Sequence, residues 1–285
     1  MISSIISTKG GPGKTTTGAN LGAFIADAGL RVLLIDMDPV QPSLSSYYNI
    51  AQEAPGGIYD LIALNNTNPR DIISVTEIPN LSLILSNDPN NQLINLLLQA
   101  PDGRLRLAQL LEAFKDQYDL ILIDTQGARS VMLEMVVLAS QLCISPLPPN
   151  MLTAREFSRG TLQMLDGLRA YARLGLPTPS VKVVVNLLDE TADARKIHDL
   201  VRNTFQAAEG IEVLDSTIPS AVIYRESATQ GIPAHRLEYR QPSNRKSPSA
   251  LSVIRGLAIE LFPQWRDHFE AMTEESVHAL VKGGR

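Results

Sequence analysis

Short apolar runs alternate with longer segments of helical spacing along most of the chain. Seven of these runs, several rich in β-branched residues, are predicted to be strands: Ile2–Ser7, Leu30–Asp36, Leu81–Leu85, Tyr118–Asp124, Leu142–Leu147, Val181–Asn186 and Ile211–Ile218. Most of the runs are continuously apolar, which is typical of strands that are buried on both faces. The pattern predicts an α/β fold in which helices flank a doubly wound, mostly parallel sheet.

The segments between the runs carry apolar residues three and four positions apart, which predicts helices. We expect them at Thr17–Ala28, Ser43–Tyr48, Gly57–Leu64, Asn91–Gln99, Arg104–Gln117, Thr153–Leu174, Ala192–Ala207, Ala221–Thr229, Ser249–Leu261 and Gln264–Val281. The stretch from His235 to Ser249 is polar and contains two prolines, so an exposed loop is expected there. No linker interrupts the pattern, and residues 1–285 are predicted to form a single domain with C-terminal helices 249–281 packed on it.

A glycine-rich turn joins the first strand to the first helix. The turn reads Lys9-Gly10-Gly11-Pro12-Gly13-Lys14-Thr15-Thr16. Glycines let the backbone bring N–H groups onto phosphate oxygens, and the helix directs its positive end to the same place. Lys14 is suited to neutralise the β- and γ-phosphates, and Thr15 to offer its hydroxyl to Mg²⁺. The sequence therefore predicts a nucleotide-binding loop.

This loop departs from the standard P-loop because Thr8 stands where that pattern has its first glycine. The form Lys-Gly-Gly-x-Gly-Lys-Thr-Thr, headed by Lys9, resembles the deviant Walker A box of the ParA/MinD family of ATPases. The resemblance implies that ATP and Mg²⁺ bind and that hydrolysis is slow. It also implies an ATP-dependent homodimer in which Lys9 reaches the nucleotide of the partner subunit. Lys9 and Lys14 are thus candidate catalytic residues.

Two of the predicted strands end in carboxylates, at the edge of the sheet where ligands of such folds bind. Asp36 and Asp124 are expected, together with Thr15, to hold Mg²⁺ directly or through water. Asp36 and Asp38 also resemble the first switch of the family, which implies that Asp38 positions or activates the attacking water. The family commonly has glutamine directly after the next proline, whereas here Val40 comes before Gln41.

The second switch is present in altered form. Asp124 is followed by Thr125-Gln126-Gly127, where the family usually has two prolines after the threonine or cysteine. This spacing allows Gly127 to place its N–H on the γ-phosphate. Gln126 either orients water or is a solvated switch residue.

Two later stretches extend the resemblance. Asn186 ends a strand, and the family uses such an asparagine at the adenine edge; the other interpretation is a strand-end turn residue. Ile218 and Pro219 begin a segment that resembles the C-terminal block of the family, whose backbone lines the base. They complete the expected nucleotide contacts.

The net charge is −5, so no overall basic field would attract nucleic acid. Residues 225–255, however, hold six basic residues against two acidic ones, a local net charge of +4. These are the candidate DNA contacts, although an ordinary solvated loop would look similar: Arg225, Arg236, Arg240, Arg245, Lys246 and Arg255. The single cysteine, Cys143, lies in an apolar run and excludes both a disulfide framework and a cysteine-ligated iron–sulfur cluster within one chain.

The resemblance leads to a functional hypothesis. We expect a ParA-type ATPase that segregates a plasmid, a chromosome or a mobile element, binds DNA non-specifically as an ATP dimer, and is stimulated by a ParB-type partner. A cytoplasmic location is expected, because no apolar run reaches the roughly 18 residues that span a bilayer. The resemblance implies that the protein associates with the nucleoid. Two alternatives remain: a MinD-like membrane-associated positioning ATPase, and a nucleotide-switched scaffold or repressor.

Overall fold

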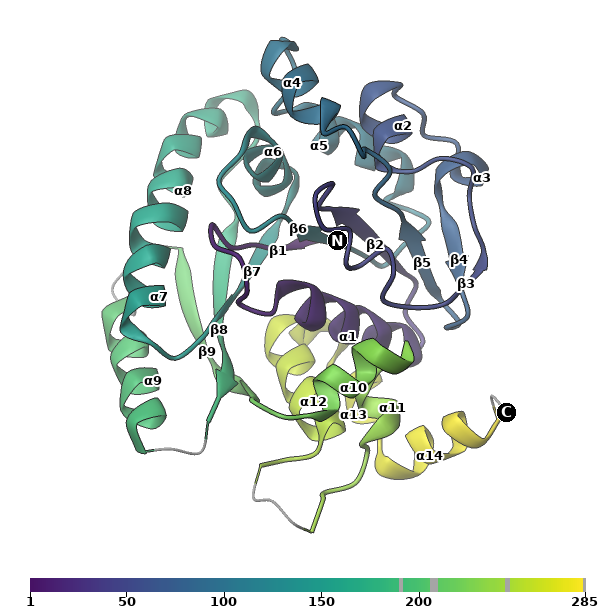
Figure 1. The fold of residues 1–285 in the computed structure, drawn as a ribbon, viewed down its shortest axis with the longest axis vertical. Coiled ribbons are helices and arrows are strands. Elements are labelled where there is room, and N and C mark those ends of the chain that lie inside the picture. Colours follow the sequence, from purple (N-terminus) through teal and green to yellow (C-terminus); the bar gives the residue numbers. More distant parts are fainter. Residues whose placement is uncertain (190–191, 206–209, 244–246, 284–285) are drawn as a thin grey trace.

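The computed structural model describes residues 1–189, 192–205, 210–243 and 247–283 and contains a nine-stranded sheet covered by helices on both faces (Figure 1). The strand order is β3-β4-β5-β2-β6-β1-β7-β8-β9. The strands are β1 Ile2–Ile5, β2 Val32–Met37, β3 Ile50–Gln52, β4 Ser74–Thr76, β5 Leu81–Ile84, β6 Leu120–Thr125, β7 Leu142–Leu147, β8 Ser180–Leu188 and β9 Ile211–Pro219. All seven predicted strands are present and parallel, so the predicted fold class is confirmed.

The remaining two strands, β3 and β4, have three residues each and form an antiparallel edge next to β5. Segments this short carry too few residues to show an alternating pattern, and the sequence did not predict them.

Most of the predicted helices are present, some with different boundaries or divided into two, and the structure adds helices at 69–72, 131–139 and 234–237. They are α1 Lys14–Asp27, α2 Ile58–Ala63, α3 Pro69–Ile72, α4 Gln92–Gln99, α5 Arg106–Leu111, α6 Val131–Ala139, α7 Met151–Glu156, α8 Gln163–Leu168, α9 Ala192–Phe205, α10 Ile223–Gln230, α11 Ala234–Leu237, α12 Ala250–Leu261, α13 Arg266–Glu270 and α14 Glu274–Gly283. A π-helical segment, Phe157–Leu162, joins α7 to α8, and 3₁₀ turns cover Glu112–Phe114, Arg169–Leu174 and Pro263–Trp265. Ala207, the end expected for α9, lies outside the described residues.

Two helix predictions are wrong. Ser43–Tyr48 is a series of turns, because the buried carboxylate of Asp36 accepts hydrogen bonds from the N–H and the hydroxyl of Ser45. The predicted helix Gln264–Val281 is interrupted between α13 and α14, where the N–H of Thr273 bonds the carbonyl of Ala271. Helix α6 was missed because apolar residues occupy all of its positions except Glu134, which hides the helical period.

Helices α1 and α12–α14 cover one face of the sheet, and α2 and α4–α9 cover the other (Figure 1). Cys143 is buried between the sheet and the helices of the second face, as expected. Within the described residues, no helix is long and apolar enough to cross a membrane. Close packing fixes α1: a Cβ added at Gly22 would lie 2.6 Å from Leu34 of β2, and one at Gly18 would lie 3.2 Å from Ile5. The N-terminus of α1 is thereby held at the carboxyl ends of the central strands.

Candidate nucleotide site

The loop between β1 and α1 requires glycine at two positions. Gly11 and Gly13 both have a φ of +84°, in the left-handed region that side chains disfavour. A Cβ at Gly13 would also lie 2.3 Å from the amide nitrogen of Asn186. The loop conformation and its neighbour on β8 therefore demand these glycines, as an anion-binding turn at a helix N-terminus would.

A cavity of about 480 Å³ opens over this loop, within the size range of small-molecule sites. Its walls come from the loop itself, from the segments that follow β2 and β6, and from α10: Gly10–Thr16, Asp38, Gln41, Ser43, Ser46, Tyr47, Thr125, Gly127 and Ala228. Asp38 and Gly127 lie far from the loop in the sequence, and the fold brings both of them to the same cavity as the loop. Gln41 reaches the cavity wall although it stands one position later than the family pattern has its glutamine.

Asp124 lies at the end of β6, directly beside the loop. It is 2% exposed, and its Oδ2 accepts a hydrogen bond of 2.6 Å from the hydroxyl of Thr15. Its Oδ1 is buried and has no partner among the described residues. Burial raises the pKa of the carboxyl to about 7, the charge of Asp36 adds to the rise, and Thr15 and Lys14 oppose it. An unpaired, buried carboxylate oxygen next to a threonine hydroxyl fits a hard divalent cation such as Mg²⁺.

Lys14 begins α1 and is largely buried. Burial lowers the pKa of its ammonium, while the carboxylates of Asp124 and Asp38 raise it. The ammonium group therefore lies within electrostatic range of both carboxylates.

Asp36 is fully buried and supports the switch segment. Its Oδ2 accepts hydrogen bonds from the N–H (2.7 Å) and hydroxyl (2.8 Å) of Ser45, and its Oδ1 accepts one of 3.0 Å from the N–H of Asp38. Burial raises its pKa to about 6. Both carboxylate oxygens therefore hold the loop in this conformation, and the expected contact of Asp36 with Mg²⁺ stays a prediction.

Asp38 forms the turn that brings Gln41 to the cavity. Its Oδ1 accepts hydrogen bonds from the N–H groups of Val40 (3.1 Å) and Gln41 (2.9 Å). Asp38 lines the larger cavity together with the loop, and its expected action on the attacking water stays a prediction.

Gly127 touches the loop through its backbone. A Cβ at this position would lie 2.7 Å from the Cα and N of Gly10 and from the carbonyl oxygen of Lys9. Only glycine fits this close approach, so the altered second switch lies against the phosphate-binding turn.

Lys9 makes an ion pair within its own chain. Its Nζ lies 2.7 Å from Oε2 of Glu156, at the end of α7, and the two side chains are 44% and 38% exposed. The neighbouring Thr8 packs on the π-helical segment, where a Cβ at Gly160 would lie 2.2 Å from its hydroxyl oxygen. No local sequence pattern predicts the contact between Lys9 and Glu156, because 147 positions separate the two residues.

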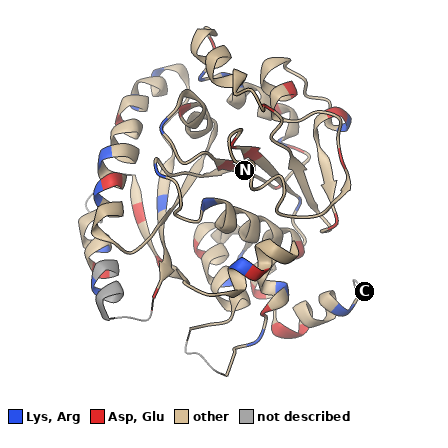
Figure 2. Cartoon of the chain, viewed as in Figure 1, with Lys and Arg blue, Asp and Glu red and all other residues tan. Residues whose placement is uncertain are grey.

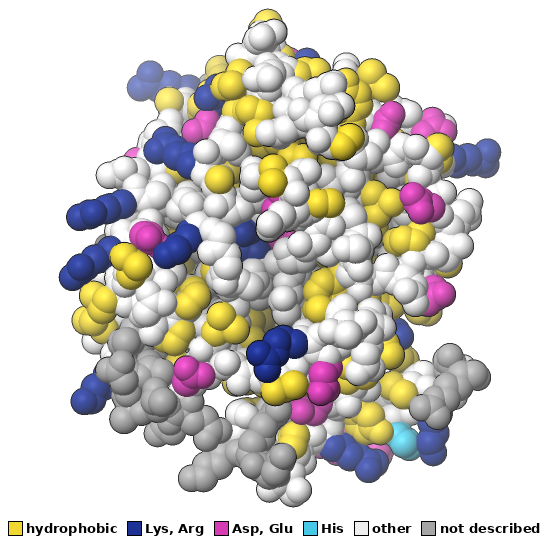
Figure 3. Space-filling view, viewed as in Figure 1, with side chains coloured by type: hydrophobic (Ala, Val, Ile, Leu, Met, Phe, Trp, Pro, Cys, Tyr) yellow, Lys and Arg dark blue, Asp and Glu magenta, His cyan; other side chains and the backbone are white. Residues whose placement is uncertain are grey.

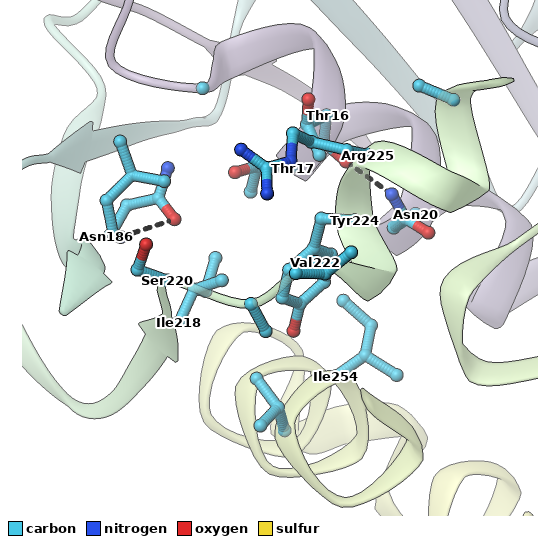
Figure 4. Close-up of a pocket in the computed structure, with 15 residues that line it drawn as sticks. Thr16, Thr17, Asn20, Asn186, Ile218, Ser220, Val222, Tyr224, Arg225 and Ile254 are labelled. Atoms are coloured by element: carbon cyan, nitrogen blue, oxygen red, sulfur yellow. Dashed lines mark hydrogen bonds between the residues drawn. The ribbon is translucent and has the colours of Figure 1, made fainter. Parts of the chain in front are cut away.

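A second cavity, of about 270 Å³, adjoins the first and shares Gly13, Thr16 and Ala228 with it (Figure 4). Ile218 lines this cavity, whereas Pro219 does not. Its other walls come from α1, β8, the segment between β9 and α10, α10 and α12: Thr17, Asn20, Asn186, Leu187, Ser220, Ala221, Val222, Tyr224, Arg225, Val253 and Ile254.

Asn186 lines this cavity, but it also supports the loop. Its amide nitrogen donates to the carbonyl of Pro12 at 2.6 Å, and its Oδ1 accepts from the N–H of Leu187 at 2.9 Å. The asparagine therefore holds the loop from β8, and its expected contact with adenine stays a prediction.

The candidate DNA contacts do not form one exposed set. Arg236 is paired with Asp27 at 2.7 and 2.5 Å and is 18% exposed, and His235 bonds the same carboxylate from the protein interior. The expected exposed loop is therefore wrong at its start, because the buried carboxylate of Asp27 requires charged partners and α11 supplies them. Arg255 is half-buried and donates to the carbonyl of Met272.

Arg225 and Arg240 are exposed. Arg240 lies over the ring of Tyr239 and 4.0 Å from Glu274. Glu226 directly follows Arg225 in the sequence, and Figure 2 shows a basic and an acidic residue next to each other on α10. The two remaining candidates, Arg245 and Lys246, lie outside the described residues.

The parallel sheet and the loop between β1 and α1 define a P-loop NTPase. A family model described as an AAA domain matches residues 1–166. The chain is 33% identical over 146 residues to the sporulation initiation inhibitor protein Soj of Bacillus subtilis (strain 168), and this match covers 51% of the chain and 57% of that protein. It is 28% identical over 229 residues to the chromosome-partitioning ATPase Soj of Treponema pallidum (strain Nichols), covering 80% and 86% of the two chains.

Solved structures agree with this assignment at the level of the fold. Apo McdA from Cyanothece superposes with a TM-score of 0.71 at 24% identity, covering 83% of this chain and 92% of that chain. The septum site-determining protein MinD of Pyrococcus horikoshii OT3, complexed with Mg-ADP, superposes with a TM-score of 0.66 at 20% identity, covering 94% and 98%. The chain belongs to the ParA/MinD-type family of P-loop ATPases.

Proposed function

We propose that this chain binds ATP and Mg²⁺ in the larger cavity, hydrolyses ATP slowly, and acts in DNA partitioning as a ParA-type ATPase. The observation that carries the ATP site is the buried, unpaired Oδ1 of Asp124 beside Thr15 and Lys14. The Mg-ADP complex of the MinD neighbour supports the choice of cofactor. The partitioning role has its support in the chromosome-partitioning Soj relative.

Each residue of the site has a proposed part in phosphoryl transfer to water. Thr15 and Asp124 would hold Mg²⁺, which when bound supplies charge neutralisation to the β- and γ-phosphates. Lys14 and the N–H groups of the loop neutralise the oxygens on which charge grows. Asp38 orients the attacking water and accepts its proton while the bond between the γ-phosphorus and the ADP oxygen breaks. Gly127 presents its backbone to the γ-phosphate.

The proposed active form is a homodimer in which Lys9 contacts the nucleotide of the partner subunit. In the single chain, Glu156 holds Lys9 at 2.7 Å, so dimer formation has to break this ion pair. A pair between half-exposed side chains contributes only about 0–1 kcal/mol. Glu156 therefore opposes dimerisation weakly.

Replacing Glu156 with glutamine should increase the ATP-dependent dimerisation constant by up to about thirtyfold, because each of the two subunits loses a pair of up to about 1 kcal/mol and the retained amide cannot pair with the Lys9 charge. Analytical ultracentrifugation of the wild type and Glu156→Gln in saturating ATP measures the constant. Glu112→Gln is the matched control, since Glu112 forms an exposed pair with Lys115 on the surface at the same distance of 2.7 Å. Weaker dimerisation of Glu156→Gln would contradict this role and place Glu156 among the groups that stabilise the dimer.

DNA binding is proposed to depend on the ATP dimer and to use exposed arginines. Arg240 is exposed near the C-terminal helices, and Arg155, Arg159 and Arg173 are exposed along the helix that runs from α7 to residue 174. Figure 3 shows Lys and Arg side chains gathered along that edge of the molecule. A dimer doubles every such contact, so several weak phosphate contacts can sum to salt-sensitive binding.

Binding of non-specific duplex DNA should require ATP and weaken steeply with salt. Replacing Arg240 with alanine removes two phosphate contacts per dimer, so the slope of log affinity against log salt should become shallower by about 2. Titrations by fluorescence anisotropy, with ATP, ADP and no nucleotide, measure both effects. Arg70→Ala is the control, because Arg70 is an exposed arginine on α3 at the opposite edge of the sheet.

Absence of DNA binding in every nucleotide state would refute the partitioning role without affecting the ATP site. ATP-dependent co-sedimentation with anionic liposomes would then indicate a MinD-like role. Function that persists in hydrolysis-dead variants would indicate a nucleotide-switched scaffold or repressor.

A further inference from the structure

Arg225 is exposed, but it also lines the smaller cavity. Its side chain extends from α10 across the cavity toward Thr16 and Thr17 in the first turn of α1 (Figure 4). Within the part of the chain that the structure describes, no hydrogen bond or ion pair engages its guanidinium. Other arginines near the sheet are used differently: Arg236 pairs with Asp27 and Arg106 pairs with Asp102. An unpaired guanidinium aimed into a cavity is available to a ligand.

The cavity has the character of a site for a flat, mostly apolar ring. Apolar side chains from β9, α10 and α12 line it, among them Ile218, Tyr224 and Ile254. It adjoins the phosphate-binding loop through Gly13 and Thr16, which both cavities share. A nucleotide whose phosphates lie on the loop would direct its base into this space.

The backbone that carries Arg225 is fixed to the nucleotide helix. Two residues further along α10, the hydroxyl of Ser227 donates to Oδ1 of Asn20 at 3.2 Å. The same Oδ1 accepts from the N–H of Ala234 at 2.7 Å, and the amide of Asn20 donates to the carbonyl of Thr16 at 2.8 Å. Asn20 and Ser227 are both buried. This network sets the distance between Arg225 and the first turn of α1, as a preorganised binding residue requires.

We propose that Arg225 is a nucleotide-binding residue whose guanidinium covers the purine base of ATP or ADP in the smaller cavity, and that it is not a DNA contact. The inference rests on the proposed binding of ATP to this chain. A guanidinium is planar and weakly hydrated, and it stacks on aromatic rings where an ammonium group does not. The adjacent Glu226 cancels the charge of Arg225 on the outer surface of α10, which makes that surface a poor site for DNA phosphates.

The test compares nucleotide and DNA affinities in Arg225→Ala, Arg225→Lys and the control Arg70→Ala. Calorimetric titration should show that Arg225→Ala raises the Kd of ATP and of ADP by the same factor, about twofold to thirtyfold. Arg225→Lys should show a smaller rise in both Kd values than Arg225→Ala, because lysine retains the charge but lacks the planar group that stacks. Arg70→Ala should bind both nucleotides like the wild type. At saturating ATP, Arg225→Ala should bind duplex DNA with the wild-type salt dependence.

Three results would overturn the inference. An unchanged Kd for both nucleotides combined with a shallower DNA salt slope would make Arg225 a DNA contact. A rise in the Kd of ATP alone would place its contact at the γ-phosphate, away from the base. Full recovery in Arg225→Lys would show that charge, and not stacking, is what the nucleotide requires. If wild-type protein itself fails to bind ATP, the proposed function is wrong and the failure lies there.

Discussion

Replacing Lys14 with alanine should lower ATP turnover at least about a hundredfold, the size of effect seen when one charge-stabilising donor is removed from an active site. The reason lies in the surroundings of the ammonium group. Lys14 is largely buried at the start of α1, and the carboxylates of Asp124 and Asp38 act on its charge. No other described lysine lines the larger cavity. ATP affinity should also fall, because the phosphates would meet these carboxylates without the cation that separates them.

Phosphate release and calorimetric ATP titration measure the two effects of Lys14→Ala. Lys115→Ala is a suitable control, because Lys115 is exposed and pairs with Glu112 on the surface. Thermal unfolding must accompany the assay, since removal of a cation from between carboxylates can also destabilise the fold. A folded Lys14→Ala variant with wild-type affinity and turnover would refute the assignment of the loop.

The sequence predicts those parts of the site that are formed by residues adjacent to one another in the chain. The loop from Lys9 to Thr16 is continuous, and the carboxylates of Asp36 and Asp124 directly end apolar strands. A parallel sheet gathers the carboxyl ends of its strands at one edge, so knowledge of the fold class brings these groups together. The structure places Thr15 and Asp124, both expected near Mg²⁺, within hydrogen-bond distance of each other.

The rest depends on contacts between distant segments. Nothing near Arg236 in the sequence indicates that Asp27, 209 positions away, would bury and pair its charge. Asn186 was interpreted from its place at a strand end, yet its amide is held by Pro12, whose position only the folded loop defines. The segment Ser43–Tyr48 forms turns and not a helix, because the N–H of Ser45 donates to the buried carboxylate of Asp36 and not to a backbone carbonyl of a helix. Local sequence patterns cannot show which distant group forms the hydrogen bond or ion pair with a given residue.

Replacing Asp38 with alanine should lower ATP turnover by at least about a hundredfold, while ATP still binds and dimers accumulate. Asp38 lines the larger cavity together with the loop, and in the proposed mechanism its carboxylate orients water and accepts its proton. Lys14 and the Thr15–Asp124 pair, which hold the phosphates and Mg²⁺ in this proposal, stay intact in the variant. Light scattering after size-exclusion chromatography in excess ATP, together with phosphate release, measures both results. A monomeric Asp38→Ala protein under these conditions would contradict the assigned role.

Asp38→Asn separates chemistry from support of the loop. Oδ1 of Asp38 accepts the N–H groups of Val40 and Gln41, and the amide oxygen of asparagine can accept the same two hydrogen bonds. Asparagine lacks the charge and the basicity that activation of water requires. If Asp38 acts on the water, the asparagine variant should be as inactive as the alanine variant and should form the same ATP dimer. If Asp38 acts only by shaping the turn that brings Gln41 to the cavity, the asparagine variant should recover most of the turnover, and the role of general base would then have to pass to another group on the cavity wall.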